Sequence, residues 1–284
     1  MIYLEKFNFA SEYKEINYIS GIKRTYYSSY YPFNIFPQKG LEEITFGHIT
    51  FLYGGNGSGK TTILNIIAEK IGAERKSLFN KSAHFDSYVS LCAEDFGYNG
   101  YMDSEIITSD DVFDYIFDIR QANQGIEKRR EELLQEHTDK KYAHFQMKSL
   151  EDYEKLKAIN DARRKNGSEY VREHVMKNLP TQSNGESALF YFTSKIKNNK
   201  IYLLDEPENS MSAKYQMDFL KFMEDSARFF NCQFIIATHS PFLLSAKESK
   251  IYSLDDNPVM VKKWTELENV RLYYNFFKKY EKEF

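Results

Sequence analysis

A glycine-rich segment between two apolar stretches is the part of the sequence best suited to chemistry. Residues 54–61, Gly-Gly-Asn-Gly-Ser-Gly-Lys-Thr, fit the pattern G-x-x-x-x-G-K-[ST]. Glycines let successive backbone N–H groups turn toward phosphate oxygens, and the helix that follows such a loop attracts the same anion. In this pattern Lys60 contacts the β- and γ-phosphates, and the Thr61 hydroxyl is a ligand for Mg²⁺. The predicted nucleotide-binding residues are Asn56, Gly57, Ser58, Gly59, Lys60, Thr61 and Thr62.

The residues on either side of this loop have the patterns that a phosphate loop needs. Residues 48–53 form an apolar run that is typical of a buried strand. Residues 62–71 have helical spacing, and Gly72 is a typical helix stop. Strand, loop and helix together distinguish a phosphate loop from a glycine-rich turn that happens to contain Lys-Thr.

Two carboxylates directly follow a second apolar run. Residues 201–204, Ile-Tyr-Leu-Leu, predict a central strand of a parallel sheet, and Asp205 and Glu206 come next. Ligands of open α/β sheets bind at the carboxyl ends of the strands. Asp205 is therefore placed to hold Mg²⁺, and Glu206 is placed to polarise an attacking water. The alternative, an acid pair that caps a helix, is less favoured beside a phosphate loop.

A histidine follows a third apolar run. Residues 234–237, Phe-Ile-Ile-Ala, predict another strand of the same sheet, and Thr-His-Ser-Pro comes after it at residues 238–241. A lone histidine is more often structural than catalytic. Because this one ends a strand of the predicted sheet, we expect His239 to contact the γ-phosphate and to position the water.

The order of these segments resembles the ABC-type ATPases, and more narrowly the soluble branch with the SMC, RecF and OLD-like AAA-family ATPases. A fourth segment, Ser-x-Gly-Glu at residues 183–186, supports this resemblance. The resemblance covers roughly residues 45–75 and 180–255. It implies an α/β fold: a P-loop NTPase with an ABC-type ATPase head, a central, mainly parallel sheet, a β-rich N-terminal part and a helical insertion.

The same resemblance implies a site shared between two chains. Such ATPases hold two nucleotides, ATP with Mg²⁺, between head-to-tail subunits. Ser183 and Gly185, with Glu186 in the same segment, would contact the γ-phosphate that is bound by the partner chain. Residues 209–212 would take the place of the family's D-loop at the dimer interface. ATP would then hold an ATP-dependent homodimer together, and hydrolysis through Glu206 would release it.

The sequence also departs from the family's pattern. Asn184 replaces the first glycine of the usual signature pair, and Glu186 stands where transporters commonly have glutamine. The glutamine that couples to Mg²⁺ is not obvious. Residues 88–92 predict a strand, after which Glu94 is a candidate for that metal-linked position; Gln121 and Gln124 are alternatives. The candidates for stacking on adenine are Tyr26, Tyr27, Tyr30 and Tyr31.

The chain divides into three expected parts. Residues 1–108 form an N-terminal lobe with a β subdomain and the phosphate loop, and residues 180–284 form a C-terminal lobe with the other motifs. Residues 109–179 predict a polar insertion of two antiparallel helices that break near residues 137–144. Basic clusters there could face nucleic acid, but a solvated helix face with neighbouring acids is the favoured interpretation. These clusters contain Lys128, Arg129, Arg130, Lys140, Lys141, Arg163, Arg164 and Lys165.

Composition limits the class of protein. The 284 residues are 42% hydrophobic and 28% charged, as in an ordinary globular protein. No apolar run is long enough to span a membrane and no signal peptide is evident, so we expect a cytoplasmic protein without a membrane partner. Cys92 and Cys232, both in predicted strands, are expected to be buried free thiols. A net charge of −3 argues against a protein that coats nucleic acid with its whole surface.

Three functions remain as hypotheses. The first is a dimerising ATPase that acts in DNA repair, chromosome maintenance or antiviral defence, alone or through a partner effector. The second is the nucleotide-binding subunit of an ABC transporter, and the third is a scaffold that senses ATP for a separate toxin or nuclease. About 45 residues follow His239, too few for an α/β domain of ordinary size, so a nuclease is expected on a separate chain.

Overall fold

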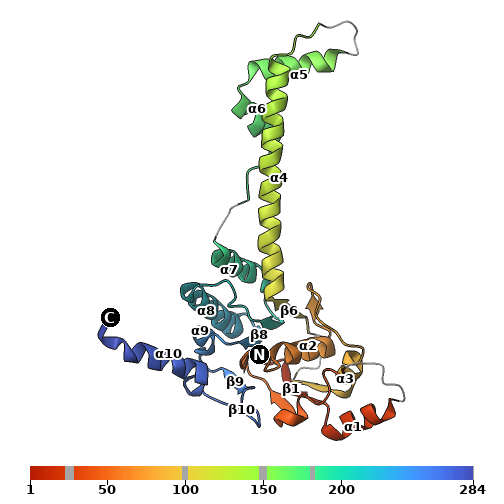
Figure 1. Cartoon of the computed structure of the whole chain (residues 1–284), viewed down its shortest axis with the longest axis vertical. Coiled ribbons are helices and arrows are strands. Elements are labelled where there is room, and N and C mark those ends of the chain that lie inside the picture. Colours follow the sequence, from red (N-terminus) through yellow and green to blue (C-terminus); the bar gives the residue numbers. More distant parts are fainter. Residues whose placement is uncertain (23–28, 98–101, 147–151, 180–182, 284) are drawn as a thin grey trace. The chain divides into compact units, whose positions relative to one another are not determined.

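The computed structural model describes residues 1–22, 29–97, 102–146, 152–179 and 183–283 (Figure 1). The chain divides into two compact units. The first unit joins Met1–Phe113 to Asn184–Phe284, and the second is Asp114–Ser183. Each unit is described by itself.

A seven-stranded sheet organises the first unit, with the strand order β10-β9-β3-β8-β7-β6-β4. Every pairing from β9 to β4 is parallel, and only β10 pairs in the antiparallel direction. The prediction of an α/β fold with a mainly parallel central sheet is therefore confirmed. The strands are β3 (Ile49–Tyr53), β4 (Glu74–Arg75), β6 (Ser104–Thr108), β7 (Ile201–Asp205), β8 (Gln233–Thr238), β9 (Lys250–Ser253) and β10 (Met260–Val261).

The central strands are apolar because both faces of the sheet are covered. All residues of β3 and β8 are buried, as are the first four of β7. Parallel pairing places Tyr53 beside Thr238, and Asp205 beside Ala237. The segments that follow these three strands consequently emerge at one edge of the sheet.

Helices pack around this sheet. Helix α2 (Lys60–Ile71) buries Ile63, Leu64, Ile66 and Ile67, and it ends at Gly72 in a left-handed conformation that suits glycine. The other helices of the first unit are α1 (Glu12–Gly21), α3 (Phe85–Leu91), α7 (Asn184–Lys195), α8 (Ala213–Phe229), α9 (Pro241–Leu244) and α10 (Glu268–Lys279), with 3₁₀ turns η1 (Pro37–Lys39), η3 (Trp264–Glu266) and η4 (Glu281–Glu283).

A small antiparallel sheet forms the β-rich N-terminal part. Its strands are β1 (Leu4–Asn8), β2 (Glu43–Thr45) and β5 (Ala93–Phe96), in the order β2-β1-β5. The sequence analysis missed α1, which follows β1 in a region expected to hold only strands and loops.

The strand predicted at residues 88–92 is wrong, because this segment belongs to helix α3 and the following Cys92. Phe85 and Tyr88 lie three residues apart and are both fully buried, so helical packing outweighs the β propensity of the segment. Cys92 and Cys232 are both buried free thiols, and Cys232 lies directly before β8.

The second unit is built on helix α4 (Ser109–Lys141), which begins in the first unit directly after β6. Helices α5 (Tyr153–Arg164) and α6 (Gly167–His174) lie at the far end of α4 (Figure 1). A small core of Leu133, Ala162 and Tyr170 joins the three helices.

The chain of this unit returns alongside α4. The Nε2 atom of His137 lies 3.0 Å from the carbonyl oxygen of Lys165, and Asn123 exchanges two hydrogen bonds with the backbone of Leu179. Helix α4 ends within the predicted break, but the return contains two short helices where one was expected.

Several basic residues of the insertion are paired with acids. Arg129 contacts Glu132 and Glu136, and Lys165 contacts Asp161 and Glu173. This pairing favours a solvated, charge-balanced face over a nucleic-acid surface at these residues. Within the described ranges, no helix combines the length and the apolar character that crossing a membrane requires.

Candidate nucleotide site

The glycine-rich loop connects β3 to α2 at the carboxyl edge of the sheet. Gly57 and Gly59 have φ angles of 78° and 100°, a region that residues with a side chain rarely adopt. A side chain at Gly54 would overlap the hydroxyl of Ser58. The loop therefore folds tightly, and the first N–H groups of α2 at its end have no acceptor within the helix.

Lys60 is buried inside this loop, with 5% of its side chain exposed. Its ammonium donates to the carbonyl oxygens of Gly54, at 2.7 Å, and Gly55, at 3.0 Å. The same nitrogen lies 3.6 Å from Oε1 of Glu206. The loop thus holds a positive charge over its own backbone, beside the acid that follows β7.

Thr61 and Asp205 form the oxygen-rich side of the site. The Thr61 hydroxyl donates to Oδ1 of Asp205 across 3.1 Å. Burial, with a smaller contribution from the charge of Glu206, raises the pKa of Asp205 to about 6, although the Thr61 hydrogen bond lowers it. A carboxylate with such a cost of burial gains from a bound cation, because the cation stabilises its charged form.

Glu206 and His239 approach each other from neighbouring strands. Oε1 of Glu206 lies 3.8 Å from Nδ1 of His239, and the amide of Glu206 donates to the carbonyl oxygen of Ala237 across 2.9 Å. Glu206 has a φ of 47°, an unfavourable conformation for a residue with a side chain. Nearly half of the His239 side chain is exposed, at 48%.

These residues surround a pocket of about 410 Å³. The predicted loop residues and both acids line it, but His239 does not. Its full lining is Asn56, Gly57, Ser58, Gly59, Lys60, Thr61, Thr62, Ser109, Asp205 and Glu206.

The donors of this pocket fit a nucleoside triphosphate with a metal ion. The buried hydroxyl of Ser58, a residue that lines this pocket, has no hydrogen-bond partner within the described ranges. The backbone amides of a glycine-rich loop suit an anion. The described residues contain no cluster of three His, Cys, Asp or Glu side chains that could hold a metal alone. Thr61 and Asp205 would supply two oxygen ligands, an arrangement that fits Mg²⁺ bound by few protein groups together with phosphates and water.

The predicted signature residues lie elsewhere. Gly185 and Glu186 start helix α7, and neither lines the pocket of its own chain. Gly185 is buried: a Cβ there would lie 2.9 Å from the carbonyl oxygen of Ser210 and 3.0 Å from the ring of Tyr215. Glycine at this position thus permits close packing against residues 209–212. Ser183 is exposed and belongs to the second unit.

Glu94 is not brought to the pocket. It lies on β5, and its carboxylate contacts the ammonium of Lys70 at 3.5 Å. Lys70 is ten residues beyond Lys60 on α2, about 15 Å along the helix axis. By contrast Ser109, which directly follows β6 beside β7, does line the pocket.

Two further residues that the sequence analysis missed hold the loop from outside. Both carboxylate oxygens of Asp255 accept from the amide of Gly55 at 3.0 Å. The ammonium of Lys39 donates to the carbonyl oxygens of Ser58, at 2.8 Å, and Leu254, at 2.7 Å. No motif marks either residue, and only the pairing of β9 with β3 could have placed Asp255 near the loop.

Two of the tyrosine candidates for adenine stacking can be located. The hydroxyl of Tyr31 donates to the hydroxyl of Thr62 across 2.9 Å, at the edge of the phosphate loop. The ring of Tyr30 instead packs against His84, with 5.1 Å between ring centroids. Tyr26 and Tyr27 lie outside the described residues.

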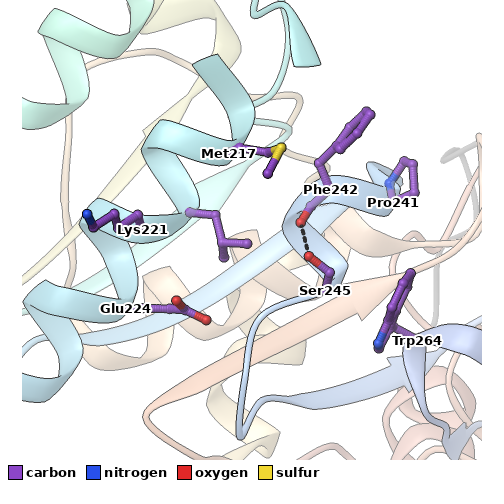
Figure 2. A pocket seen from close by; sticks show the side chains of 8 residues that line it. Met217, Lys221, Glu224, Pro241, Phe242, Ser245 and Trp264 are labelled. Atoms are coloured by element: carbon purple, nitrogen blue, oxygen red, sulfur yellow. Dashed lines mark hydrogen bonds between the residues drawn. The ribbon is translucent and has the colours of Figure 1, made fainter. Parts of the chain in front are cut away.

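A second, apolar pocket lies in the same unit. Figure 2 shows Met217 of α8, Phe242 of α9 and Trp264 around this groove, which has a volume of about 290 Å³. Lys221 and Glu224 are its charged residues. The groove shares no lining residue with the phosphate-loop pocket.

One family model matches part of the chain. Residues 117–245 match the family described as "AAA domain, putative AbiEii toxin, Type IV TA system". The matched segment contains Asp205, Glu206 and His239, and the phosphate loop precedes it. No curated protein matches the sequence.

Solved structures with a similar arrangement include SMC heads and an ABC transporter component. The Pyrococcus furiosus SMC head, solved with an extended coiled coil and bound to the C-terminal domain of ScpA, is 14% identical; the match covers 97% of this chain and 100% of that chain, with a TM-score of 0.47. The Thermotoga maritima SMC head is 13% identical over 92% and 99% of the two chains, with a TM-score of 0.42. The protein cbiO1 from Clostridium perfringens, part of the ABC transporter complex cbiONQ, is 17% identical over 84% of each chain, with a TM-score of 0.34.

Proposed function

We propose a function for this chain from two results: residues 117–245 match an AAA-domain family, and a phosphate-loop sequence connects β3 to α2 at the carboxyl edge of a mainly parallel sheet. The chain binds ATP with Mg²⁺ and hydrolyses it to ADP and phosphate. The observation that supports this most strongly is the meeting of Lys60, Thr61, Asp205 and Glu206 at one pocket.

The proposed division of labour follows from the contacts. Lys60 exchanges its two backbone carbonyl acceptors for phosphate oxygens, which offer a stronger charge-assisted interaction. Thr61 and Asp205 would hold Mg²⁺, which would neutralise phosphate charge when bound. Glu206, which lines the pocket, orients a water and accepts its proton. His239, 3.8 Å from Glu206, positions that water beside the γ-phosphate.

The second part of the proposal is an ATP-dependent homodimer. Ser183, Gly185 and Glu186 of one protomer would complete the nucleotide site of its partner, with residues 209–212 at the interface. Neither Gly185 nor Glu186 lines the pocket of its own chain, which agrees with a role across an interface. The buried packing of Gly185 on Ser210 would then couple the signature helix to the loop that carries Glu206.

The biological role that we propose is defence or DNA maintenance in the cytoplasm, through a separate effector chain. The matched family's description names a toxin–antitoxin system, which supports an effector more than a transporter. The paired basic residues of the insertion favour a protein effector over direct nucleic-acid binding. We also propose residues 1–108 and 180–284 as the two lobes of the ATPase head and residues 109–179 as the part that contacts the effector.

The test measures ATP hydrolysis and molecular mass in solution, with and without ATP and Mg²⁺. Glu206→Gln should keep ATP binding, lose turnover and accumulate a dimer, because the amide cannot accept the proton. Ser183→Arg should bind ATP but stay monomeric. A wild-type protein that never hydrolyses ATP would reject the enzyme, and a Ser183→Arg variant that still dimerises with ATP would reject the shared site.

A further inference from the structure

Glu208, two residues after the proposed base, has a buried side chain with 5% exposed. Its Oε1 atom accepts from the Thr238 hydroxyl at 2.5 Å and from the backbone amide of His239 at 3.0 Å. The same oxygen lies 3.5 Å from Nδ1 of His239. Its other oxygen, Oε2, has no hydrogen-bond partner within the described part of the chain.

The direction of the Thr238 hydrogen bond is fixed by its other neighbour. The amide of Ser240 donates to the Thr238 hydroxyl across 3.0 Å, so the single hydroxyl proton of Thr238 points at Glu208. The oxygen of Glu208 therefore accepts two hydrogen bonds from consecutive residues at the end of β8. The hydroxyl of Ser240 in turn donates to Gln216 of α8 across 2.6 Å, which fixes the far side of the same turn.

These bonds join two segments that both carry residues of the proposed reaction. Glu206 and Glu208 are in the loop after β7, and His239 is in the turn after β8. The amide of Glu206 already donates to the carbonyl oxygen of Ala237. Glu208 adds a side-chain connection two residues farther along each segment, so the separation of Glu206 and His239 is fixed on both sides.

Burying a carboxyl group to fix a turn costs free energy. Burial raises the pKa of Glu208, which means that its charged form is disfavoured at this position. A neutral acceptor such as glutamine could accept both hydrogen bonds without the cost of burying a charge. A role in stability alone accounts poorly for a glutamate here, whereas a need for an oxygen that faces both the amide and the imidazole of His239 accounts for it.

We propose that Glu208 is a positioning residue that acts through His239 and keeps the imidazole beside Glu206. This inference depends on the proposed ATPase activity. Glu208 does not line the phosphate-loop pocket, so it should influence turnover without contributing to nucleotide affinity.

A double-mutant cycle tests this role. Steady-state ATP hydrolysis is measured for the wild type, Glu208→Ala, Glu208→Gln, His239→Ala and the double variant Glu208→Ala/His239→Ala. Glu208→Ala should lower kcat about tenfold or more, with KM for ATP changed less than about twofold. Glu208→Gln should retain more activity than Glu208→Ala, since its amide oxygen can still accept both hydrogen bonds.

The decisive comparison is made in the His239→Ala background. If Glu208 acts through the imidazole, Glu208→Ala should have little further effect there. The inference would be overturned if the fold-loss of kcat in the double variant equalled the product of the two single losses. It would also be overturned if nucleotide affinity fell as much as kcat. A Glu208→Ala variant with wild-type kcat would overturn it as well.

Two measurements separate this result from misfolding and from failure of the proposed function. Glu224→Gln is the matched control, because Glu224 of α8 also accepts a backbone amide, that of Lys247 at 2.8 Å, away from the phosphate loop. It should hydrolyse ATP at the wild-type rate, and thermal unfolding should show all variants folded. Absence of hydrolysis in the wild type would instead reject the proposed ATPase.

Discussion

The two pockets of the first unit differ in the polarity of the groups that line them. The phosphate-loop pocket, of about 410 Å³, is formed by backbone amides, hydroxyls, one ammonium and two carboxylates. The groove between α8 and α9, of about 290 Å³, is lined mainly by apolar side chains such as Met217, Phe242 and Trp264 (Figure 2). Both are open concave surfaces of similar size. The difference lies in the groups that a ligand would meet, and only the first set suits a polyanion.

The largest expected effect is the loss of nucleotide binding in Lys60→Ala. Lys60 is the one charged residue of the loop sequence 54–61, and hydrogen bonds from a charged group to a bound phosphate would contribute about 1.5–3 kcal/mol each. ATP affinity, measured by titration calorimetry, should fall by about 100-fold or more. Lys81→Ala is the matched control, since Lys81 pairs only with surface acids in the described structure. Equal ATP affinity in Lys60→Ala and the wild type would reject the phosphate-loop pocket as the ATP site.

The next effect concerns Asp205 and its dependence on pH. Burial raises its pKa to about 6 in the folded protein, against about 3.9 in an unfolded chain. Between about pH 4 and about pH 6 Asp205 therefore binds a proton in the folded protein but not in the unfolded chain. The contribution of Asp205 to the free energy of unfolding falls as the pH rises through this range.

Asp205→Asn should remove this cost. Without nucleotide, it should be more stable than the wild type at pH 7.5 by on the order of 2 kcal/mol, and about equally stable at pH 4. With ATP it should lose the further stabilisation that Mg²⁺ gives the wild type, because the amide is a poorer ligand. Thermal unfolding at both pH values checks this, and a wild type that gains stability between pH 4 and pH 6 relative to the variant would contradict it.

A smaller effect is expected at Tyr31, whose hydroxyl donates to Thr62 of the polar pocket. If its ring stacks on adenine, Tyr31→Ala should weaken ATP binding about tenfold while leaving pyrophosphate binding unchanged. Tyr30→Ala serves as the control, because Tyr30 packs on His84. An equal loss of affinity for ATP and for pyrophosphate would show that Tyr31 acts on the phosphate loop, through its hydrogen bond to Thr62, and not on adenine.

The smallest effect is expected in the apolar groove. Trp264→Ala and Met217→Ala remove partly exposed side chains and should change ATP affinity and kcat by less than about twofold. Each should lower the free energy of unfolding by about 1 kcal/mol, because some apolar burial is lost. A large loss of ATP affinity in either variant would show that the two pockets are not independent.

The same contrast explains what the sequence could predict. Except for Ser109, the lining residues of the polar pocket come from one continuous run, residues 56–62, and from two residues that end or follow an apolar strand. Each part carries a local signal, and the register of parallel strands brings the parts together at one edge. The central strands could also be predicted from the sequence, since β3, β7 and β8 are continuous apolar runs.

The rest depended on contacts between distant residues. Asp255 reaches the loop from 200 positions away, and no local pattern marks it. The segment at residues 88–92 looked like a strand, but the burial of Phe85 and Tyr88 on one face makes it part of a helix. Glu94 is a sequence candidate for the metal-linked position because it follows the strand predicted at residues 88–92. In the structure β6 pairs with β7 and ends at Thr108, and Ser109, the first residue of α4, lines the pocket.

The left-handed backbone of Glu206 has a practical consequence for surveys of variants. Its φ of 47° suits asparagine better than glutamate, so Glu206→Asn should fold at least as well as the wild type. A screen that scores protein abundance would then record this substitution as harmless, although it removes the proposed base. Only a screen that reports turnover would detect the damage.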